Sequence, residues 1–120
     1  TTISQVKIIY YRKSIYLHKL KPNMTGNETV YKQVIAKWGK RAQLEMLQEE
    51  ATELALATRK YIRKDDNKRF IDLAGEVADT LIMIEQLLYM FPNMEEFVVN
   101  TKAEKVKRLS DRLNEDRFED

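Results

Sequence analysis

The chain has 120 residues, 43% of them hydrophobic and 33% charged, and a formal net charge of +2 at pH 7. This size indicates one domain with a modest core, and the nearly balanced charge argues against a nucleic-acid-binding protein. The absence of cysteine and the single histidine, His18, exclude disulfides, thiolate metal sites and sites that need two imidazoles. No apolar run approaches the roughly 18 residues of a membrane span, and the N-terminus lacks a secretory-signal pattern. We therefore expect a cytoplasmic protein without membrane contact.

Glycine and proline are scarce, with 3 and 2 residues, which favours an all-α fold. Residues 3–17 are β-branched and aromatic and fit both a helix and a strand, so the structure of residues 1–27 stays open. Residues 21–27 read as a loop in which Asn27 is a candidate N-cap. A short helix is predicted to follow from about Glu28 to Gly39.

Two long helices are expected next. Helix formers dominate residues 40–63, a polar turn follows at residues 64–68, and the second helix should run from about Arg69 to Met90. Its apolar residues recur at helical spacing and predict a core-facing stripe of Phe70, Leu73, Ala74, Val77, Leu81, Ile84 and Leu88. A last helix is predicted from Asn93 to about Arg112, before a frayed charged tail. Together these elements predict a single domain, residues 1–120, built as a bundle of about four helices with the two long ones antiparallel.

Acidic pairs interrupt both long helices. Glu50 and Glu53 are three residues apart on the first helix, and Glu76 and Asp79 are three apart on the second, so each pair shares a helix face. Glu53 and Asp79 each lie thirteen residues from Asp66 in the turn. At ~1.5 Å per residue both are then about 20 Å from the turn, and the pairs of antiparallel helices would meet. Four converging carboxylates predict a site for Mg²⁺, with Mn²⁺ as the alternative.

Other interpretations of these charges remain. Acidic pairs at this spacing are common on solvated helix faces, so a non-catalytic helical interaction module is the main alternative. A di-iron carboxylate bundle would need Glu-x-x-His pairs, which the chain lacks. A nucleic-acid binder that uses the basic last helix is disfavoured by the acids interspersed there.

The motif Glu49-Glu50-x-x-Glu53, followed after twenty-two residues by Glu76-x-x-Asp79, resembles the signature of the MazG-like all-α nucleoside triphosphate pyrophosphohydrolases. That superfamily also includes the dimeric dUTPases and the phosphoribosyl-ATP pyrophosphohydrolases. The resemblance covers roughly residues 30–113 and includes Trp38-Gly39, Gln43 and Leu54 around the first motif and residues 78–82 around the second.

This resemblance implies hydrolysis of a nucleoside triphosphate between its α- and β-phosphates, giving a monophosphate and pyrophosphate. Glu50, Glu53, Glu76 and Asp79 would then hold the metal. Glu49 would orient or deprotonate the attacking water, unless it is a surface glutamate beside the ligands, and which of Glu49 and Glu50 is the ligand stays open. The resemblance also implies a homodimer or a dimer of dimers.

Further candidates for substrate binding each have a structural alternative. Lys102, Lys105 and Arg108 recur along one broad face of the last helix and could bind pyrophosphate, or form a solvated basic face near a helix C-terminus. Trp38 could stack on a base or serve as a core or interface residue. Gln43 could contact the ribose or base, or lie at the edge of the core.

Overall fold

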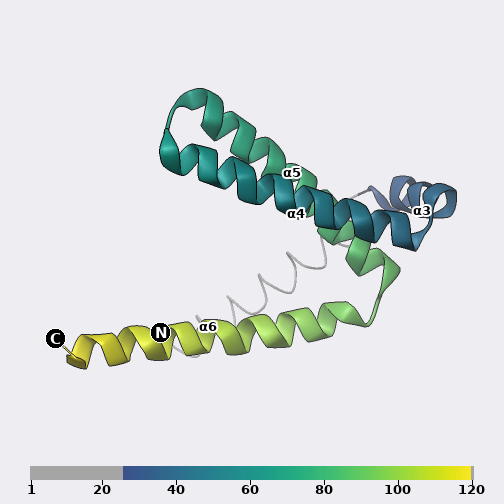
Figure 1. The fold of residues 1–120 in the computed structure, drawn as a ribbon. Coiled ribbons are helices and arrows are strands. Elements are labelled where there is room, and N and C mark those ends of the chain that lie inside the picture. The colour runs from purple at the N-terminus through teal and green to yellow at the C-terminus, as the bar shows by residue number, and fades with distance from the viewer. Residues whose placement is uncertain (1–25, 120) are drawn as a thin grey trace. The chain divides into compact units, whose positions relative to one another are not determined.

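The computed structural model describes residues 26–119, with side chains described as far as residue 115, and this part of the chain is all-α (Figure 1). It contains four helices: α3 (Glu28–Trp38), α4 (Lys40–Arg63), α5 (Asn67–Met90) and α6 (Met94–Glu119). The predicted fold class is therefore confirmed. The choice between helix and strand for residues 3–17, and the position of His18, lie outside the described residues. By its contacts the chain divides into two units, residues 1–90 and 91–120.

A single glycine joins α3 to α4. Gly39 has a φ of 89°, a value that residues with a Cβ rarely adopt, and its N–H donates to the Ile35 carbonyl at 2.8 Å. Its own carbonyl accepts the first bond of α4, from the Gln43 N–H at 3.3 Å. One residue thus ends α3 and begins α4. Asn27 occupies the N-cap position of α3 as predicted, but its side chain makes no capping hydrogen bond.

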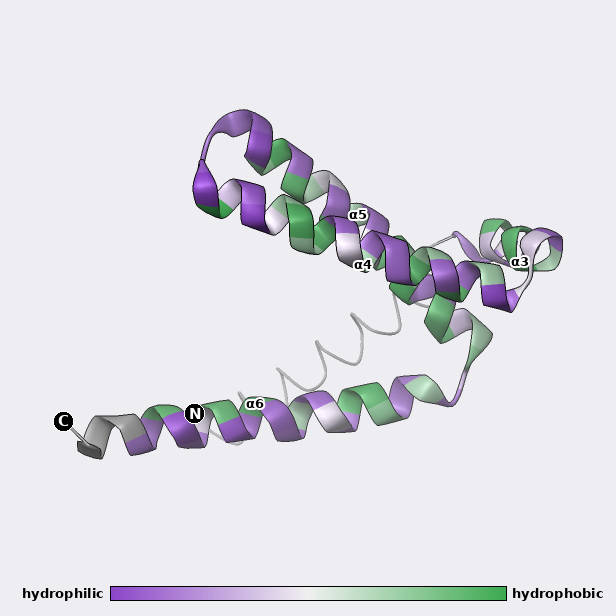
Figure 2. Ribbon diagram, viewed as in Figure 1, coloured by the Kyte–Doolittle hydropathy of each residue, from purple (hydrophilic) through white to green (hydrophobic). Residues whose placement is uncertain are grey.

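The helices α4 and α5 form an antiparallel hairpin that packs together more extensively than any other pair of helices in the described chain. The helix α5 begins two residues earlier than predicted because Asp66 caps it. The Asp66 Oδ1 accepts the Arg69 N–H at 2.9 Å, and its Oδ2 accepts a bond from the Arg69 guanidinium. Hydrophilic residues dominate the hairpin tip, whereas hydrophobic residues concentrate towards the Met90 end of α5 (Figure 2).

The face of α5 that meets α4 is not the stripe that the sequence predicts. The residues that α5 buries most deeply include Thr80, Met83 and Met90, and Leu73, Glu76 and Leu87 on the same face are half-buried. These six positions recur at alternating spacings of three and four residues, so they form one continuous seam along α5.

The predicted core stripe is largely wrong for a single chain. Phe70 is 57% exposed, and Val77, Leu81 and Ile84 are also exposed, while Leu88 is buried. The reason is geometric: one neighbouring helix can cover only one side of α5, and α4 covers the seam that contains Thr80. The face through Phe70, Val77, Leu81 and Ile84 (the outer seam) therefore remains apolar and open in this unit.

The helix α3 is attached to the hairpin by a buried tyrosine. Tyr31 is 4% exposed, and its hydroxyl donates to Glu85 Oε1 on α5 at 2.9 Å. Burial, together with this bond and the charge of Glu85, raises the pKa of Tyr31 to about 12. The sequence alone does not single out this pair.

The second unit contains α6. This helix runs to Glu119, so the helix end predicted near Arg112 is wrong. Glu95 and Glu96 lie in its first turn, as predicted, where the helix dipole favours acids. Within the described part of the chain, no helix is both long enough and apolar enough to cross a membrane.

The Asp66 cap generates the first prediction. The hydrogen bond from the Arg69 N–H, with the charges of Arg69 and Lys64, holds the pKa of Asp66 below its usual value. Its contribution to stability is therefore complete above the ordinary carboxyl pKa of about 3.9 and is lost as the pH falls through and below that value. Asp66→Asn should lower Tm at neutral pH, and the difference from wild type should shrink steadily towards about pH 3.

Thermal melts followed by circular dichroism measure this difference. Asp65→Asn is the matched control, because Asp65 is an exposed neighbour that makes no ion pair with the described residues. Equal effects of the two substitutions at neutral pH would show that the cap does not stabilise the hairpin.

Candidate metal and phosphate site

Three of the predicted metal ligands converge between the two long helices. Glu50 on α4 and Glu76 and Asp79 on α5 each offer a carboxylate oxygen, and these oxygens all lie within 4.8 Å of one another. The two residues on α5 share a face because they are three apart, and Glu50 reaches them because α4 runs antiparallel. The three residues are called the acidic triad below. The prediction that the two acidic motifs meet across the hairpin is confirmed for this triad.

Thr80 lies where the two motifs meet. Its buried side chain lies on the α4-facing seam, and Oγ1 is 2.8 Å from the Glu76 carbonyl oxygen. The same Oγ1 is 3.3 Å from the carbonyl oxygen of Glu50 on the other helix. A small hydroxyl side chain can satisfy the carbonyl four residues back and still allow a close helix approach. The backbones of two triad residues are thus bridged by one side chain.

The triad is electrostatically unfavourable as it stands. Partial burial raises the pKa of Glu50, and the negative charges of Asp79, Glu76, Glu53 and Glu49 raise it further. Glu76 Oε2 is buried and has no hydrogen-bond partner among the described residues. A buried carboxylate oxygen without a donor, beside two other carboxylates, carries a cost that a bound cation would remove. The donor set consists only of carboxylate oxygens, which suits a hard divalent ion.

The other two predicted acids lie differently. Glu53 is exposed and does not belong to the triad's closely spaced oxygens, but it lines a cavity together with Glu76 and Asp79. Glu49 is exposed and lines neither this cavity nor the triad. Of the two neighbouring glutamates between which the sequence could not choose, the structure therefore brings Glu50 to the other carboxylates.

The cavity has a volume of about 350 Å³ and extends from the triad towards the hairpin tip. Four carboxylates line it, from Glu53, Asp72, Glu76 and Asp79. Lys60 and Arg69 line the same cavity, and the sequence analysis assigned them no role. A signal for them was present: Lys60 is seven residues after Glu53 and Arg69 is seven residues before Glu76, which places each on the same helix face as its glutamate.

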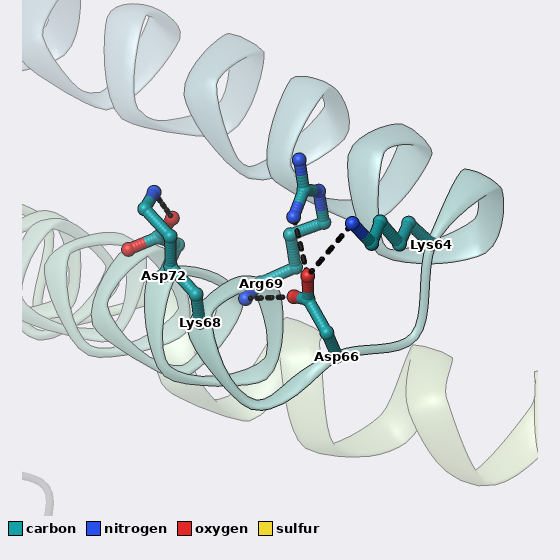
Figure 3. A network of polar contacts seen from close by, with 5 residues as sticks. All are labelled: Lys64, Asp66, Lys68, Arg69 and Asp72. Carbon is teal, nitrogen blue, oxygen red and sulfur yellow. Dashed lines mark hydrogen bonds and ion pairs between the residues drawn. The ribbon is translucent and has the colours of Figure 1, made fainter.

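The Arg69 side chain, near the hairpin tip, is held by Asp66 in the turn. Figure 3 shows Asp66 between Arg69 and Lys64, with Lys64 Nζ 3.9 Å from Asp66 Oδ2. Asp72 is paired separately with Lys68 at 3.0 Å. Arg69 is therefore oriented by a carboxylate at the tip.

Within the first unit, neither Trp38 nor Gln43 lines this cavity. Trp38 is 57% exposed, and Lys37 Nζ lies 5.0 Å from the centroid of its ring. Gln43 is only 5% exposed, so it offers little surface to a substrate. Lys102, Lys105 and Arg108 are exposed on α6, in the second unit. The geometry of the first unit thus gives the triad and its cavity a definite structure, but does not bring Trp38 or Gln43 to it.

Comparison with known proteins adds no assignment: no protein-family model, no curated protein and no solved structure matches this chain.

The repulsion within the triad generates the second prediction. Because the pKa of Glu50 is raised in the folded state, its ionised form destabilises the fold, and its contribution to stability should fall as the pH rises above the ordinary glutamate pKa of about 4.3. Without metal, Glu50→Gln should therefore raise Tm at pH 7 and have little effect at about pH 4. With millimolar Mg²⁺, wild-type Tm should rise, and this response should be weaker in Glu50→Gln.

Thermal melts with chelator and with Mg²⁺ make the comparison. Glu49→Gln is the control, because it removes the same charge one residue away from the triad and should keep the Mg²⁺ response. A response lost in Glu49→Gln and kept in Glu50→Gln would reverse the assignment of the ligand.

Proposed function

We propose that this chain is a magnesium-dependent nucleoside triphosphate pyrophosphohydrolase, which cleaves the bond between the α- and β-phosphates. The observation that supports the proposal most strongly is the convergence of Glu50, Glu76 and Asp79, one of which has a buried carboxylate oxygen without a donor among the described residues. Its second support is the resemblance of the two acidic motifs, at this spacing, to the MazG-like signature.

In this proposal the triad holds the metal, and Glu53 on the cavity wall completes the ligand set or binds a second ion. When bound, Mg²⁺ would neutralise charge on the phosphate oxygens and position them for attack. Glu49 is assigned to orienting or deprotonating the attacking water, an assignment that requires its exposed side chain to turn towards the triad. A cavity lined by both acids and cations suits a ligand that is a metal-bound polyphosphate.

The second candidate function is a non-catalytic interaction module. The exposed outer seam of α5 favours it, because an open apolar helix face is typical of a protein that binds another helix. The two candidates differ in what they require of the triad. An interaction module needs no convergence of carboxylates at the centre of its hairpin, whereas a pyrophosphohydrolase does.

The proposed activity predicts a specific product pattern. Incubation with a panel of ribo- and deoxyribonucleoside triphosphates and Mg²⁺ should give the monophosphate and pyrophosphate, and chelator should abolish the reaction. Glu76→Gln and Asp79→Asn should each reduce kcat by at least about a hundredfold, because each removes charge where the metal is held. Glu45→Gln, on an exposed turn of α4 away from the triad, should leave the rate unchanged.

Chromatographic separation of the products reads out the bond that is cut. Orthophosphate and a nucleoside diphosphate would contradict cleavage between the α- and β-phosphates. No turnover, together with no Mg²⁺-dependent change in Tm, would favour the interaction module.

We further propose that a second copy of the chain covers the outer seam of α5. Phe70, Ala74, Val77, Leu81 and Ile84 recur at spacings of four, three, four and three residues. This heptad-like spacing is the pattern by which helices of symmetric partners pack, and an isologous dimer needs such a self-complementary face. Among the described residues, no side chain is less than 2% exposed, so the hairpin lacks a fully enclosed core of its own.

This proposal predicts a dimer that a single charge disrupts. Leu81→Lys should convert the dimer to a monomer in sedimentation equilibrium, because a lysine on the outer seam would be desolvated without a partner. Val30→Lys, at an exposed apolar position on α3, should leave the dimer intact. A wild-type chain that is monomeric up to about 100 µM, well above the affinity range of stable dimers, would contradict the proposal.

A further inference from the structure

Two basic side chains share the cavity of the acidic triad. Lys60 comes from α4 and Arg69 from α5, and both line the cavity with Glu53 and Glu76. Each is seven residues from its glutamate in the direction of the hairpin tip, which corresponds to two helical turns, or about 10 Å. The two cations therefore lie nearer the hairpin tip (the basic end) and Glu53, Glu76 and Asp79 lie further from it (the acidic end), while Asp72 lies between Arg69 and Glu76 along α5.

Arg69 is already oriented at this basic end. Its side chain is 34% exposed, and Asp66 accepts a bond from its Nη1 while accepting the Arg69 backbone N–H through the other oxygen. Within residues 26–115 the structure gives Nε and Nη2 of Arg69 no acceptor. A guanidinium held on one side by a carboxylate keeps a planar set of donors for an anion and loses little side-chain entropy when it binds one.

Lys60 contributes a second cation that has no ion pair with the described residues. Its neighbours at the tip are paired: Lys64 with Asp66, and Lys68 with Asp72. A long side chain on a helix leans towards the N-terminus of that helix, which for Lys60 means towards Glu53 and the triad. From the basic end of the cavity, the Lys60 side chain can therefore reach towards a ligand held at the triad.

The charge balance makes anion binding conditional on metal. Four carboxylates line the cavity against two cations, and Glu50 at the triad adds a further negative charge. Without a divalent ion, the cavity repels a phosphate. Asp72 is offset by its ion pair with Lys68, so a divalent ion at the triad together with Lys60 and Arg69 would balance the charges of Glu50, Glu53, Glu76 and Asp79.

We propose that Lys60 and Arg69 bind the terminal phosphates of a metal-bound polyphosphate, the part that leaves as pyrophosphate. This inference rests on the proposed function and adds to it the residues that hold the leaving group. It assigns this role to the first unit itself, where the cavity contains both the acids and the cations, instead of to Lys102, Lys105 and Arg108 on α6.

A structural alternative is that the two cations only offset the negative charge of the cavity. The two roles differ in their effect on anion binding. If the cations merely offset charge, removing either one would change Mg²⁺ affinity without selectively weakening pyrophosphate binding. If the cations bind phosphate, removing either one should lower pyrophosphate affinity while Mg²⁺ affinity stays unchanged or rises.

The experiment measures the two affinities separately on the full chain by isothermal titration calorimetry. Mg²⁺ is titrated first, and inorganic pyrophosphate is then titrated at saturating Mg²⁺. Lys60→Gln and Arg69→Gln should each weaken pyrophosphate binding about tenfold, the scale of a charged hydrogen bond, with Mg²⁺ binding no weaker than in wild type. Without Mg²⁺, wild type should bind pyrophosphate too weakly to detect.

Arg63→Gln is the matched control, because it removes the same charge from the last turn of α4 at an exposed position outside the cavity. It should bind pyrophosphate as wild type does. Circular dichroism and Tm verify that each variant is folded, and Arg69→Lys gives a milder variant that should weaken binding less than Arg69→Gln.

Three outcomes would overturn the proposal. Wild-type pyrophosphate affinity in both Lys60→Gln and Arg69→Gln, with Mg²⁺ binding intact, would remove these residues from the site and leave the proposed function standing. Equal weakening in Arg63→Gln would show a general charge effect. A wild-type chain that binds no Mg²⁺ would refute the proposed function and this inference with it.

Discussion

The register of α4 against α5 is the constraint on which the site depends. The acidic pairs lie on separate helices, and each helix turns by about 100° per residue, so a slip of one residue would carry Glu50 away from Glu76 and Asp79. Two polar contacts accompany this register. Asp66 closes the tip by capping α5, and Thr80 at the seam lies within hydrogen-bonding distance of the Glu76 and Glu50 carbonyl oxygens. Both lie on or beside the helices that carry the triad, so the geometry of the hairpin and the geometry of the site are set together.

Much of this arrangement follows from local sequence signals. Helix formers, the polar turn and the stop at Pro92 determine α4 and α5 to within two residues of the predicted bounds. Counting equal distances from Asp66 then brings the acidic motifs to one height, because helical rise is nearly constant. The predicted core stripe failed for a different reason. The helix α5 carries two seams with the same alternating spacing. Periodicity alone does not identify which of them packs against α4, because that depends on tertiary contacts. Thr80 and Glu76, which look unsuitable for a core, lie on the seam that α4 covers.

The site could be predicted to the level of motifs but not of individual side chains. The spacing of Glu50 and Glu53 makes them equivalent in sequence, yet only Glu50 joins the triad, because the helix faces differ by about 60° and the crossing of α5 favours one. The sequence does not single out Lys60 and Arg69, because isolated cations near a turn are common. Their position becomes informative only when the hairpin places them in the same cavity as the acids. Gln43, which the sequence suggested for substrate contact, is instead buried in the first unit.

The stability of the hairpin and its proposed function draw on the same groups. Repulsion at the triad and a buried oxygen without a donor among the described residues destabilise the centre of the hairpin. The exposed outer seam reduces the apolar area that the hairpin buries, and with it the hydrophobic contribution to its stability. A ligand or partner that binds only the folded chain stabilises it in proportion to its concentration above its dissociation constant. Under the proposed assignment, Mg²⁺ would relieve the first weakness and a second copy the second. The folded population would then rise under the same conditions in which the catalytic site is complete, because the features that make the isolated hairpin marginal are those that its ligands occupy.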